Sequence, residues 1–490
     1  MNPFLITAFK QYRLLLTLFL SMVLINVLEA QKINNTQKPN IIIILADDMG
    51  YGDAGCYGQQ KIATPHIDEM ASKGMRFTQF YSGSAVCAPA RTTLLLGRHT
   101  GHISIRGNRG IKPEGQYPLA ATDTTFPMLL QKSGYATAAF GKWSLGFIGS
   151  SGDPANKGFT DFYGYNCQTL AHNYYPDHLW NNTTRINFPG NEKNHTNYSA
   201  DLIHQQALNF IQRQSKDQPF FLYLPYTLPH ADLAVPHDSV YNGYVQLFND
   251  PALPQPAKTK DPDKIFEPYP HAAYAAMVSR LDNYVGEILK AIQQKGIEEN
   301  TLVIFLSDNG PHKEDGNDPT FFNSSGGLRG IKRDLYEGGI REPFIAYWKG
   351  SILPQTTSEY SAALWDLFPT FLEMAHLPKV KNTDGISLLP VLVGKVQIPH
   401  PYMYWELHES GGKQAIRMKN WKAVRLNVSS VANSHIELYD LSKDSGEKMD
   451  VARQNPGLIA QMEKLFKEAH TPDKNWPLLM NESSQIIQAN

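Results

Sequence analysis

The sequence predicts an α/β fold in which helices sandwich a large, mostly parallel or mixed central sheet, with a smaller C-terminal unit of a four-stranded antiparallel sheet plus a helix. Three observations support it: continuous apolar runs typical of buried parallel strands, helical patterns between them, and short strand-like segments joined by polar turns after about residue 396. At 490 residues with 42% hydrophobic residues, the chain is long enough for one large core or two domains.

The clearest expected strand is Asn40–Ala46, a β-branched apolar run that ends directly in Asp47-Asp48-Met49-Gly50. The run at 301–306 has the same design and ends in Ser307-Asp308-Asn309-Gly310. Ligands collect at the carboxyl ends of strands in such sheets, so both acidic motifs fall where a ligand would bind. Further strands are expected at 135–140, 219–226 and 343–348.

Helical and C-terminal patterns complete the expected architecture. Apolar residues recur at steps of three and four and predict an amphipathic helix with Met277, Leu281, Val285, Ile288, Leu289 and Ile292 on one face. Short strands are expected at 402–406, 414–417, 422–425 and 437–440, followed by a helix that carries Leu458, Ile459, Met462, Leu465 and Phe466. The Pro- and Lys-rich stretch 250–270 is expected to be a surface excursion. We therefore divide the chain into a larger domain, 31–395, which contains both acidic motifs, and a C-terminal subdomain, 396–490.

The first thirty residues are expected to be a cleaved secretory signal. Lys10 and Arg13 precede the apolar run 14–28, and Ala30 offers a small residue for cleavage. A membrane-spanning helix needs about 20 apolar residues, so an uncleaved anchor is the less favoured alternative. We expect a secreted or periplasmic protein with no stable membrane span.

Charge and cysteine content exclude two further classes. A formal net charge of -1 gives no polyelectrolyte signal, so no nucleic-acid partner is expected. An exported chain with only three cysteines is not stapled by disulfides. If Cys87 is used otherwise, Cys56 and Cys167 could pair, an alternative that their spacing leaves open.

The segment Cys87-Ala88-Pro89-Ala90-Arg91 precedes an apolar run, 92–96, that predicts a helix. Pro89 suits the first helical turn because its missing N–H would have no partner there. Cys87 would then lie at a helix N-terminus, where unpaired N–H groups and the dipole favour an anion, and Arg91 would add a second anion contact. The alternative is a buried cysteine before an ordinary helix.

The two acidic motifs offer only oxygen ligands: Asp47, Asp48, Asp308 and Asn309. Three carboxylates converging in a sheet crevice would repel one another unless a cation neutralised them. Oxygen ligands select a hard divalent ion, calcium or magnesium, over zinc. The alternative is that both motifs are simply turn formers after strands.

The motif Cys-x-Pro-x-Arg, continued here to Gly97-Arg98, resembles the signature of the formylglycine-dependent sulfatases, the arylsulfatase-type members of the alkaline phosphatase-like superfamily. The resemblance runs from about Lys38 to the last helix, with five further motifs in the family's order. It implies that a formylglycine-generating enzyme oxidises Cys87 and that the hydrated aldehyde is the nucleophile. It also implies that the four oxygen ligands and residue 87 bind Ca²⁺, with Mg²⁺ as the alternative, and that a small second domain follows.

The resemblance assigns catalytic roles to several more residues. Lys142, in Gly141-Lys142-Trp143-Ser144, would contact the sulfate and the hydrate, and Lys332 would be the second sulfate-binding lysine. His230, in Leu228-Pro229-His230, would protonate the departing alcohol. Arg91 and the metal would stabilise the hydrate.

Ser144 departs from the family's commonest pattern, which has a histidine at this place. Ser144 could hold the hydrate by a hydrogen bond, but a hydroxyl is a poor base near neutral pH. The base that helps to expel sulfate is therefore not assigned, and water or a neighbouring histidine such as His312 are the candidates.

These observations predict a sulfatase that acts on a sulfate monoester, expected to be an exo-acting enzyme on a sulfated carbohydrate. Substrate contacts are expected from His172, in the His-, Asn- and Tyr-rich stretch 169–197, and from His312 and Arg329. A small-aryl sulfatase, a formylglycine-dependent phosphonate hydrolase and a non-catalytic glycan-binding relative are the alternatives. Glu337 and Arg341 are expected to be structural.

Overall fold

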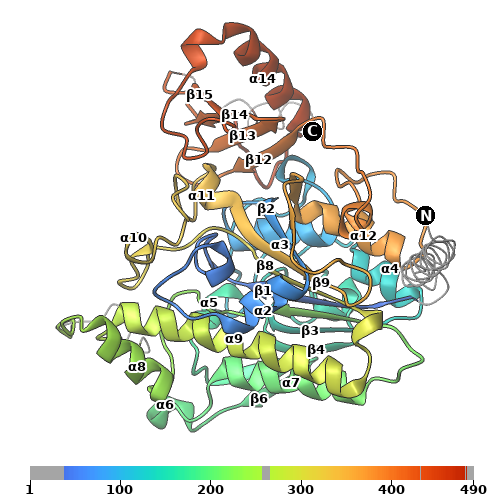
Figure 1. Ribbon diagram of the computed structural model, residues 1–490, viewed down its shortest axis with the longest axis vertical. Helices are drawn as coiled ribbons and strands as arrows, with labels where there is room; N and C mark the ends of the chain where they lie inside the picture. Colours follow the sequence, from blue (N-terminus) through green and yellow to red (C-terminus); the bar gives the residue numbers. More distant parts are fainter. Residues whose placement is uncertain (1–37, 256–264, 431, 480–481, 483–490) are drawn as a thin grey trace, which may run out of the picture.

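The computed structural model describes residues 38–255, 265–430, 432–479 and 482. The predicted signal peptide and the middle of the expected excursion at 250–270 lie outside these residues. Within them, no helix is both long enough and apolar enough to cross a membrane. The predicted fold class is confirmed: a mixed 11-stranded sheet covered by helices is followed by a separate four-stranded antiparallel sheet (Figure 1).

The large sheet has the strand order β10-β2-β9-β8-β1-β7-β3-β4-β5-β6, and β11 pairs with β2. Its strands are β1 (Asn40–Ala46), β2 (Met75–Tyr81), β3 (Ala136–Lys142), β4 (Asp161–Tyr165), β5 (His178–Asn181), β6 (Thr184–Asn187), β7 (Phe220–Pro225), β8 (Thr301–Ser307), β9 (Arg341–Tyr347), β10 (Thr356–Ser358) and β11 (Ala362–Ala363). Strand β1 pairs in parallel with β7 and β8, whereas β9 is antiparallel to β8 and β2.

Except for the last, which packs on the C-terminal sheet, the α-helices of the described residues cover the faces of the large sheet or join its strands. They are α2 (Pro65–Lys73), α3 (Cys87–Leu96), α4 (Phe126–Lys132), α5 (Gln168–Ala171), α6 (Asn191–Asn194), α7 (Ser199–Arg213), α8 (Ser239–Phe248), α9 (Pro270–Lys295), α10 (Pro319–Phe322), α11 (Glu337–Ile340), α12 (Leu367–Met374), α13 (Leu389–Leu392) and α14 (Pro456–Ala469).

Strand β1 shows why the helices form two layers. Its alternate side chains point to opposite faces of the sheet. Ile42 and Ile44 join the apolar cluster built with α7 and α9, and Ile41 and Ile43 join the cluster built with α3, α4 and α12. Figure 1 shows α7 and α9 along one side of the sheet and α3, α4 and α12 on the other. A strand buried on both faces therefore reads as one continuous apolar run.

The C-terminal sheet consists of β12 (Met403–Leu407), β13 (Lys413–Met418), β14 (Trp421–Leu426) and β15 (His435–Asp440), paired antiparallel in that order. One face, with Trp405, packs against Tyr81 and Trp365 of the larger domain. The other face, with Tyr404, packs against Met462 of α14. We propose that the chain divides into two domains, 31–395 and 396–490.

A buried ionic network also joins the two sheets. The Glu337 carboxylate accepts hydrogen bonds from Tyr81 Oη at 2.7 Å and from Lys422 Nζ at 3.0 Å. Lys422 Nζ also lies 2.9 Å from Glu447 Oε1, and the side chains of Glu337 and Lys422 are 0% exposed. Burial would raise the pKa of Glu337, but Lys422 and Arg341 outweigh it and lower the pKa to about 2. The stability that this ionised carboxylate contributes is therefore present above about pH 4.5 and is lost as the pH falls toward 2.

We predict that Lys422→Met lowers the free energy of unfolding by about 3–5 kcal/mol, because it leaves two carboxylates buried without their shared cation. Urea denaturation at neutral pH measures the change. Lys443→Met is the matched control, since its ammonium pairs with Asp440 at the surface and its side chain is 81% exposed. Equal effects of the two substitutions would contradict a stabilising role for this network.

Candidate active site

The carboxyl ends of three strands and the start of one helix meet at one edge of the large sheet. Parallel register places Ala46 beside Ser307, so the residues that follow β1 and β8 are neighbours. Strand β3 ends at Lys142 nearby, and α3 begins with Cys87. The residues gathered here are each at most 1% exposed: Asp47, Asp48, Cys87, Arg91, Lys142, Asp308 and Asn309.

Helix α3 begins as the sequence predicts, with Pro89 in its first turn. Val86 has extended backbone at the N-cap, and the first helical bond runs from Ala90 N–H to its carbonyl at 3.2 Å. The N–H of Ala88 donates to Asn108 Oδ1 at 3.2 Å, which satisfies one of the otherwise unpaired N–H groups of the first turn. All ten residues of the helix are buried, so the position of Cys87 is fixed by packing on every side.

The Cys87 thiol lies among charged groups. Its Sγ is 3.1 Å from Asp47 Oδ1 and 3.7 Å from Lys142 Nζ. Burial, followed by the charges of Asp308 and Asp47, raises the pKa of this thiol well above its usual value. The thiolate is the reactive form of cysteine, so an unmodified Cys87 is a poor nucleophile here.

Three cations offset the three carboxylates of the cluster. Lys142 Nζ is 2.6 Å from Asp47 Oδ2, and Lys332 Nζ is 2.7 Å from Asp48 Oδ2. Arg91 donates from Nε to Asp308 Oδ2 at 2.9 Å. Three formal negative charges and three positive charges sum to zero, which is what allows so many ionised groups to be buried together.

The carboxylates nevertheless differ in their protonation. Burial would raise the pKa of Asp47, but Lys142 and other nearby cations outweigh it and hold the pKa well below its usual range. Burial, together with the charge of Asp47, raises the pKa of Asp308 to about 7.

Asp48 adopts left-handed backbone with φ of 64°, a strained conformation of the kind that clusters at functional sites.

This donor set fits a hard divalent cation. The Asn309 amide donates to Asp48 Oδ1 at 2.6 Å, whereas its own Oδ1 is buried without a hydrogen-bond partner among the described residues. An orphaned buried oxygen costs free energy unless something binds it. Ligand atoms of Asp47, Asp48, Cys87 and His230 lie within 4.8 Å of one another. Carboxylate and amide oxygens are the ligands that calcium and magnesium prefer.

His230 presents Nε2 to this cluster. Its Nδ1 donates to the carbonyl of Ala231, and Nε2 lies 3.1 Å from Lys332 Nζ and 3.3 Å from Asp48 Oδ2. Burial, followed by the charges of Lys332 and Lys142, lowers the pKa of His230 well below its usual value. Without bound substrate the imidazole is therefore neutral, with Lys332 as the adjacent proton donor.

Both ring nitrogens of His312 form hydrogen bonds to the backbone. The side chain is 0% exposed; Nε2 donates to the Pro229 carbonyl at 3.1 Å, and Nδ1 accepts from Glu314 N–H at 3.2 Å. Its ring is 6.0 Å from that of His230. With neither nitrogen open, His312 is poorly suited to be the missing base or a direct substrate contact. Its bonds instead hold the backbone next to His230.

The other two expected substrate contacts have different surroundings. His172 has a 42% exposed side chain, and its ring lies 4.6 Å from that of His230. Arg329 instead donates to Tyr439 Oη at 2.7 Å and to the Glu447 carbonyl at 3.0 Å. These bonds hold Arg329 against the C-terminal subdomain and give no support to a substrate role.

Ser144 is fully buried two residues after Lys142, with left-handed backbone (φ 63°) and no hydrogen-bond partner for Oγ among the described residues. The Ser144 hydroxyl can therefore still form a hydrogen bond.

Asn108 and Glu314 contribute to the site but were not predicted from the sequence. Asn108 Oδ1 accepts from the first turn of α3, and the N–H of Glu314 donates to His312. Only Glu314 could have been found from the sequence, because it lies two residues after His312.

All three cysteines are free, so the possible pairing of Cys56 with Cys167 does not occur.

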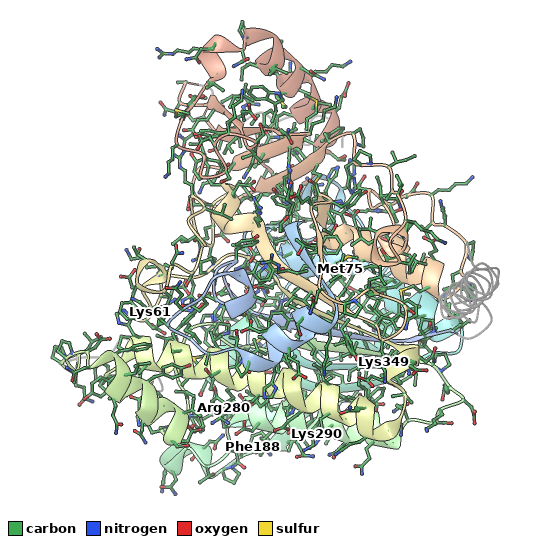
Figure 2. All side chains as sticks on the ribbon, viewed as in Figure 1. Lys61, Met75, Phe188, Arg280, Lys290 and Lys349 are labelled. Carbon is green, nitrogen blue, oxygen red and sulfur yellow. The ribbon has the colours of Figure 1, made fainter. Side chains whose placement is uncertain are left out.

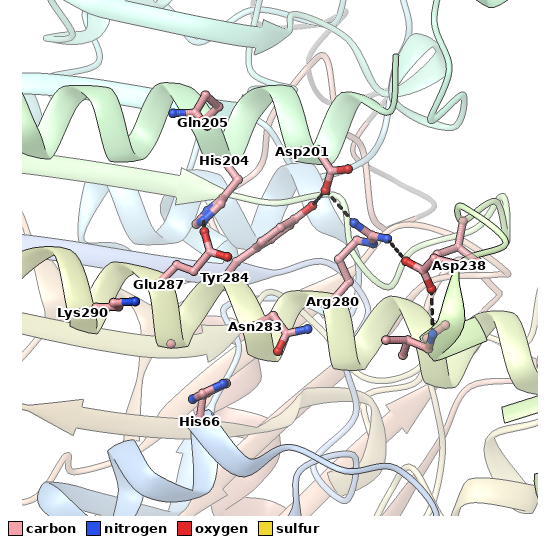
Figure 3. A pocket seen from close by; sticks show the side chains of 14 residues that line it. His66, Asp201, His204, Gln205, Asp238, Arg280, Asn283, Tyr284, Glu287 and Lys290 are labelled. Carbon is pink, nitrogen blue, oxygen red and sulfur yellow. Dashed lines mark hydrogen bonds and ion pairs between the residues drawn. The ribbon is translucent and has the colours of Figure 1, made fainter. Parts of the chain in front are cut away.

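A cavity of about 530 Å³ lies elsewhere, between α7 and α9. Figure 3 shows Arg280 of α9 there between Asp201 and Asp238, and Figure 2 labels Arg280 and Lys290 on the helical layer below the sheet. No residue of the Cys87 cluster lines this cavity.

The motifs and their convergence agree with comparisons to known proteins. A family model described as Sulfatase matches residues 39–377, more than half of the chain. The chain belongs to the sulfatase family. Human arylsulfatase A is 31% identical over 482 residues, with 87% of this chain and 87% of that protein covered. Mouse N-acetylgalactosamine-6-sulfatase is 33% identical over 390 residues, with 75% of this chain and 69% of that protein covered.

A second family model matches the C-terminal part of the chain, and a solved structure has a similar fold. A family model described as N-sulphoglucosamine sulphohydrolase, C-terminal, matches residues 330–471. The crystal structure of Ps i-CgsB in complex with k-i-k-neocarrahexaose superposes with a TM-score of 0.73 at 28% identity, covering 88% of this chain and 93% of that one. The predicted family and enzyme class, a sulfuric ester hydrolase, are confirmed.

We predict that His312→Asn lowers kcat for 4-nitrophenyl sulfate about two- to fivefold, because it disturbs the backbone that carries His230. The shape of the kcat/KM profile against pH should stay that of the parent enzyme, since a histidine with both nitrogens bonded is not the titrating base. Loss of one limb of the pH profile in His312→Asn would contradict this and identify His312 as the base.

Proposed function

We propose that this sulfatase removes sulfate from a terminal sugar of a carbohydrate, as an exo-acting enzyme, through a formylglycine made from Cys87. The observation that carries the proposal is the buried, charge-balanced cluster around Cys87, whose Sγ lies 3.7 Å from Lys142 Nζ and 3.1 Å from Asp47 Oδ1, with Lys332 paired to the neighbouring Asp48. The carbohydrate is supported by similarity to N-acetylgalactosamine-6-sulfatase and to a structure that holds neocarrahexaose.

Asp47, Asp48, Asp308, Asn309 and residue 87 would hold the cation, for which we propose Ca²⁺ with Mg²⁺ as the alternative. When bound, it would supply positive charge against developing negative charge on the sulfuryl oxygens. The free Oδ1 of Asn309 and the acidic pair that follows β1 support this assignment.

Side chains of this protein would perform the remaining steps. Lys142 and Lys332 bind sulfuryl oxygens, and Arg91 keeps Asp47 and Asp308 in place. In the free enzyme Nε2 of His230 carries no proton; with the anionic ester bound it would take one up, with Lys332 Nζ at 3.1 Å as the adjacent donor, and pass it to the departing alcohol oxygen. Oxidation of Cys87 would supply a hydrated aldehyde whose one hydroxyl attacks sulfur and whose other allows sulfate to leave, a step that a plain serine or cysteine ester lacks.

Ser144 and the N-terminal segment would contribute to binding of the hydrate and to export of the protein. The buried Oγ of Ser144 would bind the hydrate of residue 87, leaving water as the candidate for the base. Maturation requires a formylglycine-generating enzyme, and the apolar N-terminus supports a secreted or periplasmic location after cleavage of the signal.

We predict that the enzyme hydrolyses 4-nitrophenyl sulfate and monosulfated sugars but not a phenyl phosphonate monoester. His230→Ala should lower kcat/KM on the sugar by about 10²–10⁴-fold, because a sugar alkoxide needs a proton to leave, and on the aryl sulfate by less than about tenfold. Equal losses on both substrates would contradict an acid role for His230. Phosphonate turnover above sulfate turnover would instead favour the hydrolase alternative.

We also predict that CaCl₂ at about 100 times its Kd adds about 2.7 kcal/mol to the free energy of unfolding. Asp308→Asn should abolish this increment because it removes a charged oxygen ligand. The exposed Asp217→Asn is the control and should retain it. Thermal unfolding with and without calcium measures the effect without using activity, and an increment that survives Asp308→Asn would contradict the proposed site.

A further inference from the structure

The groups at the centre of the site bind the sulfate and the cation under the proposed function, and the alcohol part of the substrate needs contacts of its own. The alcohol would leave from the side of His230, because that residue supplies its proton. Lys332 Nζ lies 3.1 Å from His230 Nε2. The polar groups next to Lys332 are therefore in a position to meet the departing alcohol.

Two further charged residues lie beside Lys332. Glu314 Oε2 is 3.8 Å from Lys332 Nζ, and Glu314 Oε1 accepts a hydrogen bond from Arg333 Nη1 at 2.8 Å. The Lys332 side chain is 3% exposed, whereas those of Glu314 and Arg333 are 31% and 44% exposed. Polar contacts thus run without a break from the buried His230, through Lys332, to a pair of groups that face solvent.

The backbone of Arg333 is held from two sides, so its side chain starts from a fixed position. Its N–H donates to the carbonyl of Ala85, two residues before Cys87, at 2.9 Å. Its own carbonyl accepts from Lys413 Nζ at 2.7 Å. Arg333 also has left-handed backbone with φ of 73°, a strained conformation that clusters at functional sites when it occurs outside glycine.

The C-terminal subdomain supplies a third member of this group. Glu409 follows β12, and its Oε2 accepts from Arg333 Nε at 3.2 Å. Among the described residues, Arg333 Nη2, Glu314 Oε2 and Glu409 Oε1 form no hydrogen bond. The group therefore offers a donor between two acceptors. A sugar hydroxyl both donates and accepts, so it matches such an arrangement.

The charges of the group favour hydroxyls over a second anion of the substrate. Burial would raise the pKa of Glu314, but Lys332 and Arg333 outweigh it and lower the pKa, so this carboxylate is ionised. Lys332 is already paired with Asp48. One guanidinium against the carboxylates of Glu314 and Glu409 leaves an uncompensated negative charge, which would repel a further sulfate or carboxylate.

We propose that Arg333 and Glu314 bind hydroxyl groups of the sugar that carries the sulfate, and that Glu409 is a positioning residue for the Arg333 guanidinium. This inference rests on the proposed function and deepens it, because it makes an otherwise uncharged, hydroxyl-bearing sugar the unit that is bound beside Lys332. A simple aryl sulfate has no such hydroxyl and serves as the control substrate.

The test uses the full-length, formylglycine-containing enzyme and a panel of galactose and N-acetylglucosamine derivatives monosulfated at each hydroxyl. On the best of these, Arg333→Met should lower kcat/KM by about tenfold or more, whereas turnover of 4-nitrophenyl sulfate should stay within about twofold. Arg213→Met is the matched control and should change neither activity. Its side chain is 49% exposed and pairs with Asp161 at the start of β4, the end of the strand away from the site.

Glu409→Gln tests the positioning role. Alone, it should lower kcat/KM on the sugar by about two- to fivefold, and in the Arg333→Met background it should have no further effect, because it acts through the guanidinium. An unchanged loss in that background would show that Glu409 acts on structure and would overturn its positioning role.

Monodeoxy analogues of the best sugar sulfate test the contacts without altering the protein. The parent enzyme should lose about tenfold on at least one analogue, and Arg333→Met should lose no more on that analogue than on the intact sugar. Equal losses of sugar and aryl turnover in Arg333→Met, or full activity of the parent on every monodeoxy analogue, would overturn this inference alone. Aryl turnover with no turnover of any sugar would overturn the carbohydrate assignment, and the inference with it.

Discussion

The mutual neutralisation of three buried carboxylates and three buried cations is the constraint on which this active site depends. A lone buried carboxylate would give up its charge, and a lone buried lysine likewise. Here Lys142 and Arg91 hold Asp47 ionised while Lys332 pairs with Asp48, so the groups stay charged only as a set. Under the proposed function, a dication would replace the lysines as partner of the carboxylates, and the sulfate ester would replace the carboxylates as partner of the lysines.

The fold brings these charged residues together through ordinary strand pairing and helix packing. Parallel pairing of β1 with β8 brings Asp47 and Asp308 to the same edge, and buried packing of α3 presents Cys87 to them. The C-terminal subdomain is joined to the larger domain by the bond from Arg329 to Tyr439 and by the Glu337 network. At both places, ionised groups are buried in pairs of opposite charge.

Much of this was predictable because the decisive side chains directly follow continuous apolar strands. Such strands are buried on both faces and pair in parallel, so the acidic motifs after β1 and β8 had to meet. Strand β2 was missed because its partly exposed residues lack that pattern, and β5 and β6 because they are short and polar. The bonding of His312 and Arg329 depends on residues far along the chain, which no local pattern contains.

Mass spectrometry of the tryptic peptide 77–91 tests the central claim most directly, using protein made with and without a formylglycine-generating enzyme. The account predicts that sulfur at Cys87 is replaced by an aldehyde oxygen only in the first sample, and that sulfatase activity rises in proportion to the modified fraction. Persistence of cysteine despite a competent modifying enzyme, or full activity of the unmodified protein, would contradict it.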